Sequence, residues 1–139
     1  MKSLLFIILL LPMTSFSQDL DKHLWKDRLL LVIGDSYQNP NLINQLQELN
    51  NNKQDLKERK LIVYQIIRTS FQQGIQKNTS TKKSAVYKRY NPFNEDFKII
   101  LIGLDGNIKL KSNKVLSPSQ IFDKIDKMPM RKLELRTKN

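Results

Sequence analysis

Three predominantly apolar runs divide the chain, and each has the length of a buried strand. They occupy residues 28–34, 61–67 and 97–104. A strand without polar alternation is typical of the centre of a sheet that is covered on both faces. The runs therefore predict the central strands of one sheet.

A helical pattern separates the first two runs. Asn39 is placed as an N-cap and Pro40 as the first helical residue. Apolar residues then recur at helical spacing: Leu42, Ile43, Leu46, Leu49 and Leu56. Asparagines at 50–52 weaken or break this helix. The strand–helix–strand order predicts a right-handed βαβ unit.

The third run leads into a predicted hairpin. Asp105-Gly106 favours a two-residue turn, because both positions of such a turn need positive φ. Residues 107–112 then alternate between polar and apolar, which indicates an antiparallel strand with one exposed face or edge.

The last helix has a complete start signal. Ser117 is the predicted N-cap, Pro118 the first helical residue and Gln120 the partner in a capping box. Its inward stripe consists of Ile121, Phe122, Ile125 and Met128. Pro129 lacks an amide donor and should end or kink the helix.

The middle of the chain, residues 68–94, is the least regular. Residues 77–84 are polar and low in complexity, which predicts a mobile loop. Residues 85–90 suggest a short helix capped by Ser84. The elements run β-α-β, a variable crossover, then β-β-α around a mixed sheet, which is the arrangement of the thioredoxin-like α/β fold.

The N-terminus has the pattern of a signal peptide. An apolar run at 4–11 is followed by small residues, with Ser17 at the −1 position of a cleavage site. The run is too short to serve as a transmembrane anchor. We expect residues 1–17 to be removed, leaving a single domain that starts at Gln18 and is exported to the periplasm or beyond.

Charge suggests the kind of partner. The chain has 24 Lys and Arg against 13 Asp and Glu, a formal net charge of +11. Such an excess favours an anionic polymer, lipid headgroups or an acidic protein. Nucleic acid is less favoured because few aromatic residues lie among the scattered lysines. Solubility alone is the alternative explanation of the charge.

The residue inventory excludes several chemistries. The chain contains no cysteine and one histidine, so thiol redox chemistry and ordinary zinc sites are excluded, and no cofactor is expected. His23 lies in a polar lead-in and is expected to be solvated. Trp25 is expected to cover an edge of the core.

The loop after the first strand is where a thioredoxin-like fold places its nucleophile. Asp35, Ser36 and Tyr37 are weak catalytic candidates there. A serine hydroxyl needs an adjacent base, and the sole histidine lies upstream. Turn and capping bonds are therefore the favoured roles of Asp35 and Ser36.

The C-terminal segment Ile-Asp-Lys-Met-Pro-Met-Arg, residues 125–131, is distinctive. Asp126 could pair with Arg131 across the kink. Met128 and Met130 flank Pro129 and could either close the core or offer an adaptable partner surface, and both interpretations stay open.

Segments 58–63, 102–111 and 125–131 together resemble a peroxiredoxin-like domain of unknown function. Asp105-Gly106 and the Met-Pro-Met block carry most of the likeness. The resemblance implies a thioredoxin-like fold and export, because this family occurs in short exported bacterial proteins. It also occurs in animal sushi-repeat-containing and related extracellular matrix proteins, which are associated with adhesion. Without cysteine, thiol peroxidase activity does not carry over.

The leading hypothesis is an exported, non-catalytic binding module with a basic surface. The expected contact residues are Arg59, Arg131, Arg136, Lys82 and Lys83. The alternative is an enzyme at the loop after the first strand, either a fold-analogous oxidoreductase or one with other non-thiol chemistry. The oligomeric state is left open.

Overall fold

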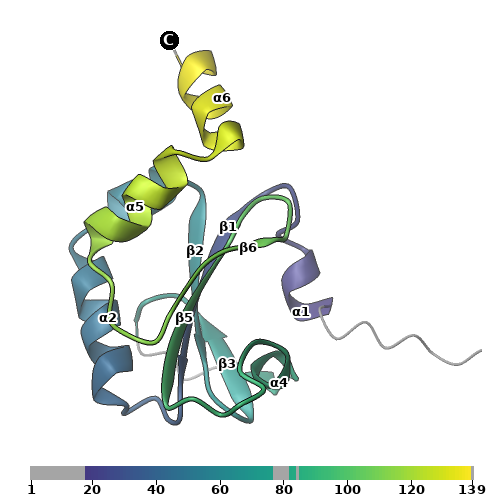
Figure 1. Cartoon of the computed structure of the whole chain (residues 1–139), viewed down its shortest axis with the longest axis vertical. Helices are drawn as coiled ribbons and strands as arrows, with labels where there is room; N and C mark the ends of the chain where they lie inside the picture. Colours follow the sequence, from purple (N-terminus) through teal and green to yellow (C-terminus); the bar gives the residue numbers. More distant parts are fainter. Residues whose placement is uncertain (1–17, 77–81, 84, 139) are drawn as a thin grey trace, which may run out of the picture.

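The computed structural model describes residues 18–76, 82–83 and 85–138, which contain one mixed six-stranded sheet in the order β4-β3-β2-β1-β5-β6 (Figure 1). The strands are β1 Arg28–Gly34, β2 Leu61–Ile66, β3 Ser70–Gln73, β4 Lys82–Lys83, β5 Phe97–Ile102 and β6 Ile108–Ser112. β1 is parallel to β2, and the other neighbouring pairs are antiparallel. The predicted thioredoxin-like α/β architecture is confirmed.

Helices cover both faces of this sheet, which explains why the central strands lack polar alternation. One face packs against α2 Pro40–Asn50, α3 Lys53–Glu58 and α5 Pro118–Asp126, and the other against α1 Gln18–Asp21 and α4 Val86–Tyr90 (Figure 1). In β1, Leu30 and Val32 enter the first core, whereas Leu29 and Leu31 enter the second. Both sides of the strand are therefore buried.

The predicted helix starts at Asn39 and Ser117 are confirmed. The Asn39 side chain accepts hydrogen bonds from the amides of Asn41 and Leu42, at 2.9 and 3.1 Å. Ser117 and Gln120 form the reciprocal capping box. The asparagines at 50–52 do break the helix, because α2 ends at Asn50 and α3 begins after them.

Two details of the predicted strands need correction. Asp105 does not adopt positive φ; instead the Gly103 amide donates to the Asn107 carbonyl, and Gly106 alone takes φ 80°. The hairpin loop thus has three residues with glycine in the left-handed position. Lys82–Lys83, expected in a mobile loop, pair with β3 as an edge strand; residues 77–81 and 84 lie outside the described residues.

The helices at residues 85–90 and beyond Pro129 also refine the predictions. The N-cap of α4 is Ala85, not Ser84. Pro129 ends one helix and begins another, because α6 Pro129–Thr137 starts there and extends away from the sheet (Figure 1). None of the described helices has the length and hydrophobicity that crossing a membrane would require. The predicted signal peptide lies outside the described residues.

The expectation for Trp25 is wrong. Trp25 is 63% exposed, and its backbone has φ 63°, a conformation that residues other than glycine rarely adopt. The Trp25 amide donates to the Leu104 carbonyl at 2.7 Å, which fixes this strained turn against the β5–β6 loop. The core edge is covered instead by Leu20 of α1.

Candidate functional site

The loop after β1 is closed by its own polar groups. The Asp35 amide donates to the Asp96 carbonyl, and the Asp35 carboxylate accepts from Asn39 Nδ2 at 2.9 Å. Ser36 Oγ accepts the Gln38 amide at 3.2 Å. Because the Asn39 side chain already caps the first amides of α2, the helix N-terminus offers little to stabilise an added anion.

Tyr37 lies apart from the other two candidates in this loop. Its hydroxyl is 3.0 Å from Ser70 Oγ on β3. It borders a cleft between α2 and the sheet whose described lining contains no arginine and no histidine. Asp35, Ser36 and Tyr37 are therefore neighbours along the chain, but their described contacts do not form a nucleophile–base pair.

At the opposite end of β1, arginines and carboxylates form an internal network. Arg131 Nε lies 3.2 Å from Asp126 Oδ1, and Arg131 Nη2 lies 3.2 Å from Glu58 Oε1. Arg59 Nη2 lies 2.9 Å from the other Asp126 oxygen. The predicted pairing of Asp126 with Arg131 is thus present, and Asp126 bridges two arginines.

Arg28, which the sequence did not single out, completes the network from the first residue of β1. Its side chain is fully buried; Nη1 donates to the Arg59 carbonyl at 2.9 Å and lies 3.1 Å from a Glu134 oxygen. Its Nε and Nη2 have no hydrogen-bond partner within the described part of the chain. Arg28 and Glu134 are separated by 106 positions, so sequence spacing gave no signal for this pair.

The network changes the ionisation of its members. Burial acts to raise the pKa of Asp126, but the hydrogen bonds and charges of Arg59 and Arg131 outweigh it and hold this pKa below its usual value. Burial acts to lower the pKa of Arg131, and its hydrogen bonds to Asp126, Glu134 and Glu58 reverse that effect. Both groups are charged at neutral pH.

These contacts bear directly on the predicted binding residues. The side chain of Arg131 is 2% exposed and that of Arg59 is 13% exposed, and the Arg59 guanidinium also lies 4.5 Å from the Phe122 ring. Arg131 is therefore an internal group rather than a surface cation, because its charge is used to hold α6 on the domain. Arg136 is exposed on α6.

The two methionines of the motif have different environments. Met128 is buried in the core formed by α2, α3 and α5, and Met130 is 43% exposed on α6. Pro129 between them starts α6. Met128 therefore closes the core, whereas the partner surface stays a prediction for Met130. Leu133, at 49% exposure, continues the exposed apolar side of α6.

The internal network leaves an excess of positive charge outside. Carboxylates of Asp55, Glu58, Asp126 and Glu134 face the arginines. Around them, exposed cations of α3, α5, α6 and the adjoining turns have no ion-pair partner in the described structure. We call these residues the basic end: Lys53, Lys57, Lys60, Lys124, Lys127, Lys132 and Arg136.

His23 is buried, and the expectation that it is solvated is wrong. Its Nδ1 lies 2.7 Å from Asp27 Oδ2, and its Nε2 lies 2.6 Å from the Tyr64 hydroxyl on β2. The His23 and Tyr64 rings also meet edge to face. The reason is long-range, because a buried tyrosine hydroxyl needs a polar partner and His23 supplies it across the sheet face.

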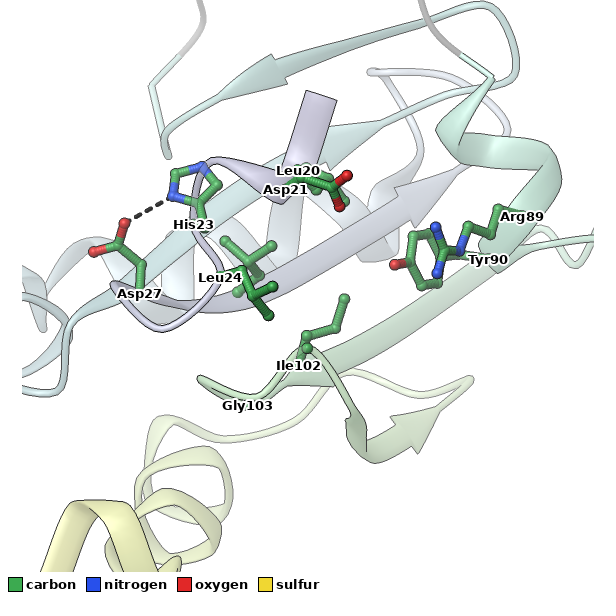
Figure 2. A pocket seen from close by; sticks show the side chains of 11 residues that line it. Leu20, Asp21, His23, Leu24, Asp27, Arg89, Tyr90, Ile102 and Gly103 are labelled. Carbon is green, nitrogen blue, oxygen red and sulfur yellow. Dashed lines mark hydrogen bonds and ion pairs between the residues drawn. The ribbon is translucent and has the colours of Figure 1, made fainter. Parts of the chain in front are cut away.

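Figure 2 shows His23 and Asp27 pointing toward each other on one side of a small cavity, with Arg89 and Tyr90 of α4 on the other side. The cavity holds about 60 Å³, and burial raises the pKa of Tyr90. Space for only a few water molecules is too little for an organic substrate. We interpret the His23 cluster as the link that fastens the N-terminal lead-in to the sheet.

The described residues do not bring together the side chains that a metal ion requires. Across residues 18–76, 82–83 and 85–138, no group of three or more His, Cys, Asp or Glu side chains is arranged to hold a metal ion.

The fold and these sites define a class: a cysteine-free domain of thioredoxin-like architecture. Its structure is similar to the mitochondrial 2-Cys peroxiredoxin from Plasmodium falciparum, with a TM-score of 0.54 and 13% identity over 77% of this chain and 78% of that one. This likeness concerns the fold alone. Residues 19–134 match the family model described as Domain of unknown function (DUF4174), and the chain belongs to that family. Among curated proteins, no match was found.

Proposed function

We propose that this protein is an exported, non-catalytic interaction module that binds an anionic partner through its basic end. The observation that carries the proposal is the division of charge at that end. The nearby carboxylates pair with arginines except for the exposed Asp123 of α5, so among the described residues the exposed lysines and Arg136 outnumber their neutralising neighbours. Such uncompensated charge attracts anionic polymers and acidic proteins.

The exposed surface of α6 supports the same proposal. Met130 and Leu133 are 43% and 49% exposed; Met130 precedes Lys132 on the helix, and Leu133 lies between Lys132 and Arg136. Apolar and cationic side chains that alternate on one helix provide contact area as well as charge. A free cationic surface with only scattered lysines would lack this apolar component.

Export is part of the proposal and is supported by the signal-peptide pattern of residues 1–17. If the pattern is cleaved as proposed, the exported protein begins at Gln18. Mass spectrometry of the protein recovered outside the cytoplasm tests this, and an intact N-terminus on that protein would contradict it.

Heparin chromatography with a matched pair of variants tests the anionic partner. Lys127→Gln, Lys132→Gln and Arg136→Gln remove three charges from the basic end; Arg68→Gln, Lys88→Gln and Lys114→Gln remove three exposed charges from elsewhere. We expect the first triple variant to elute at clearly lower salt than the second, because local charge density and not net charge binds the polymer.

Equal elution of the two triple variants would contradict a role for the basic end. Failure of the wild-type protein to bind heparin, anionic vesicles or an acidic protein at low salt would contradict the anionic partner altogether. Stronger binding to an oligonucleotide than to the other probes would replace the proposed partner class by nucleic acid.

A further inference from the structure

A second surface of the molecule has a different chemistry. A cleft of about 370 Å³ lies between α2 and the β2–β3 part of the sheet, within the size range of small-molecule sites. Among the described residues, no charged side chain lines it. Its polar lining is formed by carboxamides, those of Gln38, Gln47, Asn50, Gln65, Gln72 and Gln76.

Hydrogen bonds hold several of these carboxamides in fixed orientations. Gln72 Nε2 donates to Gln65 Oε1 at 2.8 Å, and Gln65 Nε2 donates to the carbonyls of Gly74 and Gln76 at 3.0 and 3.2 Å. Gln76 Nε2 donates in turn to Asn50 Oδ1 at 3.2 Å. The lining is thus a connected network that joins β2, β3 and the end of α2 before any ligand arrives.

One member of the network keeps an unused acceptor. Gln72 is 4% exposed, and its carboxamide oxygen accepts no hydrogen bond from the described residues. This oxygen is not fully enclosed by protein, so solvent in the cleft can reach it. The Gln72 oxygen is therefore suited to accept a hydrogen bond from a group that enters the cleft.

We propose that this cleft binds a neutral polyhydroxylated ligand, a saccharide by chemical class. Each sugar hydroxyl both donates and accepts a hydrogen bond, and each carboxamide offers both functions on one rigid plane. Ile43 and Ile75 and the ring of Tyr37, which the Ser70 hydroxyl fixes in place, supply apolar surface for the C–H faces of a sugar ring.

The position of the cleft separates a saccharide from other ligands. Anionic ligands are disfavoured because the part of its lining that the structure describes contains no lysine or arginine. An extended peptide binds by adding a strand at a sheet edge, but β3 is already flanked by β2 and β4. The cleft opens over a face of the sheet, where side chains and not backbone groups make the contacts.

Nuclear magnetic resonance of the full chain tests the proposal, with maltose, cellobiose and N,N′-diacetylchitobiose as probes. At least one disaccharide should shift the side-chain amide signals of Gln47 and Gln72. Gln72→Leu should weaken that binding by about tenfold, the effect of one lost hydrogen bond in a desolvated site. Because Gln72→Leu could disturb folding, the exposed Gln47→Ala is the second variant, and Gln54→Ala on α3, outside the cleft, is the matched control.

Three results would overturn the proposal: no disaccharide shifts these signals at millimolar concentration, both cleft variants bind like the Gln54→Ala control, or an uncharged capped tripeptide binds in place of the sugars. The basic-end triple variant should bind the disaccharide like the wild-type protein. Its retention of sugar binding keeps this test independent of the anionic partner.

Discussion

The two ends of β1 are held by different chemistry. At its C-terminal end, a carboxamide closes the loop: Asn39 caps α2 and donates to the Asp35 carboxylate and the Asp96 carbonyl. At its N-terminal end, Arg28, Arg59 and Arg131 pair with carboxylates and hold α6. The end where this fold can place a nucleophile therefore has fewer charged contacts, and the distinctive sequence motifs lie at the other end.

This contrast teaches how a motif should be interpreted. Asp126 and Arg131 lie in the most recognisable stretch of the chain, yet their side chains face each other and Arg131 is internal. Buried ion pairs are costly to break because the surviving partner loses its counter-charge. A recognisable charged motif can thus reflect contacts inside the molecule, and it is the scattered lysines around it that we propose as the contacts to a partner.

The largest expected effect comes from breaking the charged end. Arg131→Met should lower the free energy of unfolding by about 3 kcal/mol, because three carboxylates lose a buried partner. Urea unfolding followed by circular dichroism measures this. The exposed Arg136→Met on the same helix should change it by less than about 0.5 kcal/mol. Equal effects of the two variants would show that the network does not hold α6.

A substitution at the C-terminal end of β1 should change the free energy of unfolding less. Asn39→Ala should cost about 1 kcal/mol, the usual loss for an N-cap, because the amides of Asn41 and Leu42 lose their acceptor. The neighbouring exposed Asn41→Ala serves as the control in the same urea experiment and should stay close to wild type. A loss for Asn39→Ala as large as that for Arg131→Met would erase the contrast between the two ends.

The smallest expected effect is on the stability of the fold at acidic pH. The pKa of Asp126 in the folded protein is below its ordinary value of 3.8, so the ionised form stabilises the fold. That stabilisation is fully present above about pH 3.8 and is lost as the pH falls toward the folded value. Asp126→Asn should therefore flatten the acid limb of stability against pH. The same steepness in both proteins would mean that Asp126 is not the responsible group.

Local signals predicted much of this fold. The apolar runs located β1, β2 and β5 because a strand buried on both faces needs no partner information to be recognised. Asn39 and Ser117 marked helix starts because a cap bonds to amides within three residues. The hairpin at Asp105-Gly106 was located correctly, and only its loop length was wrong.

The other predictions that failed concern residues whose partners lie far away in the sequence. β3 was not predicted, because its sequence Ser-Phe-Gln-Gln is too polar to suggest a strand. In the structure, Gln72 is bonded to Gln65 on the neighbouring strand. His23 looked solvated because its partner Tyr64 is 41 positions away. Arg131 looked like a surface contact because two of its acceptors, Glu58 Oε1 and the Glu58 carbonyl, come from the end of α3, 73 positions away.

The sequence by itself determined the centre of the sheet, the helix starts and the exclusion of thiol chemistry, because each depends on residues close in the chain or on composition. Only the tertiary structure decided which charges are internal and which are exposed, because that depends on elements brought together from distant positions. The basic end and the carboxamide cleft both follow from that second decision. Neither could be predicted from spacing alone, since contacts between distant elements, such as Arg28–Glu134 and Gln65–Gln72, help to define them.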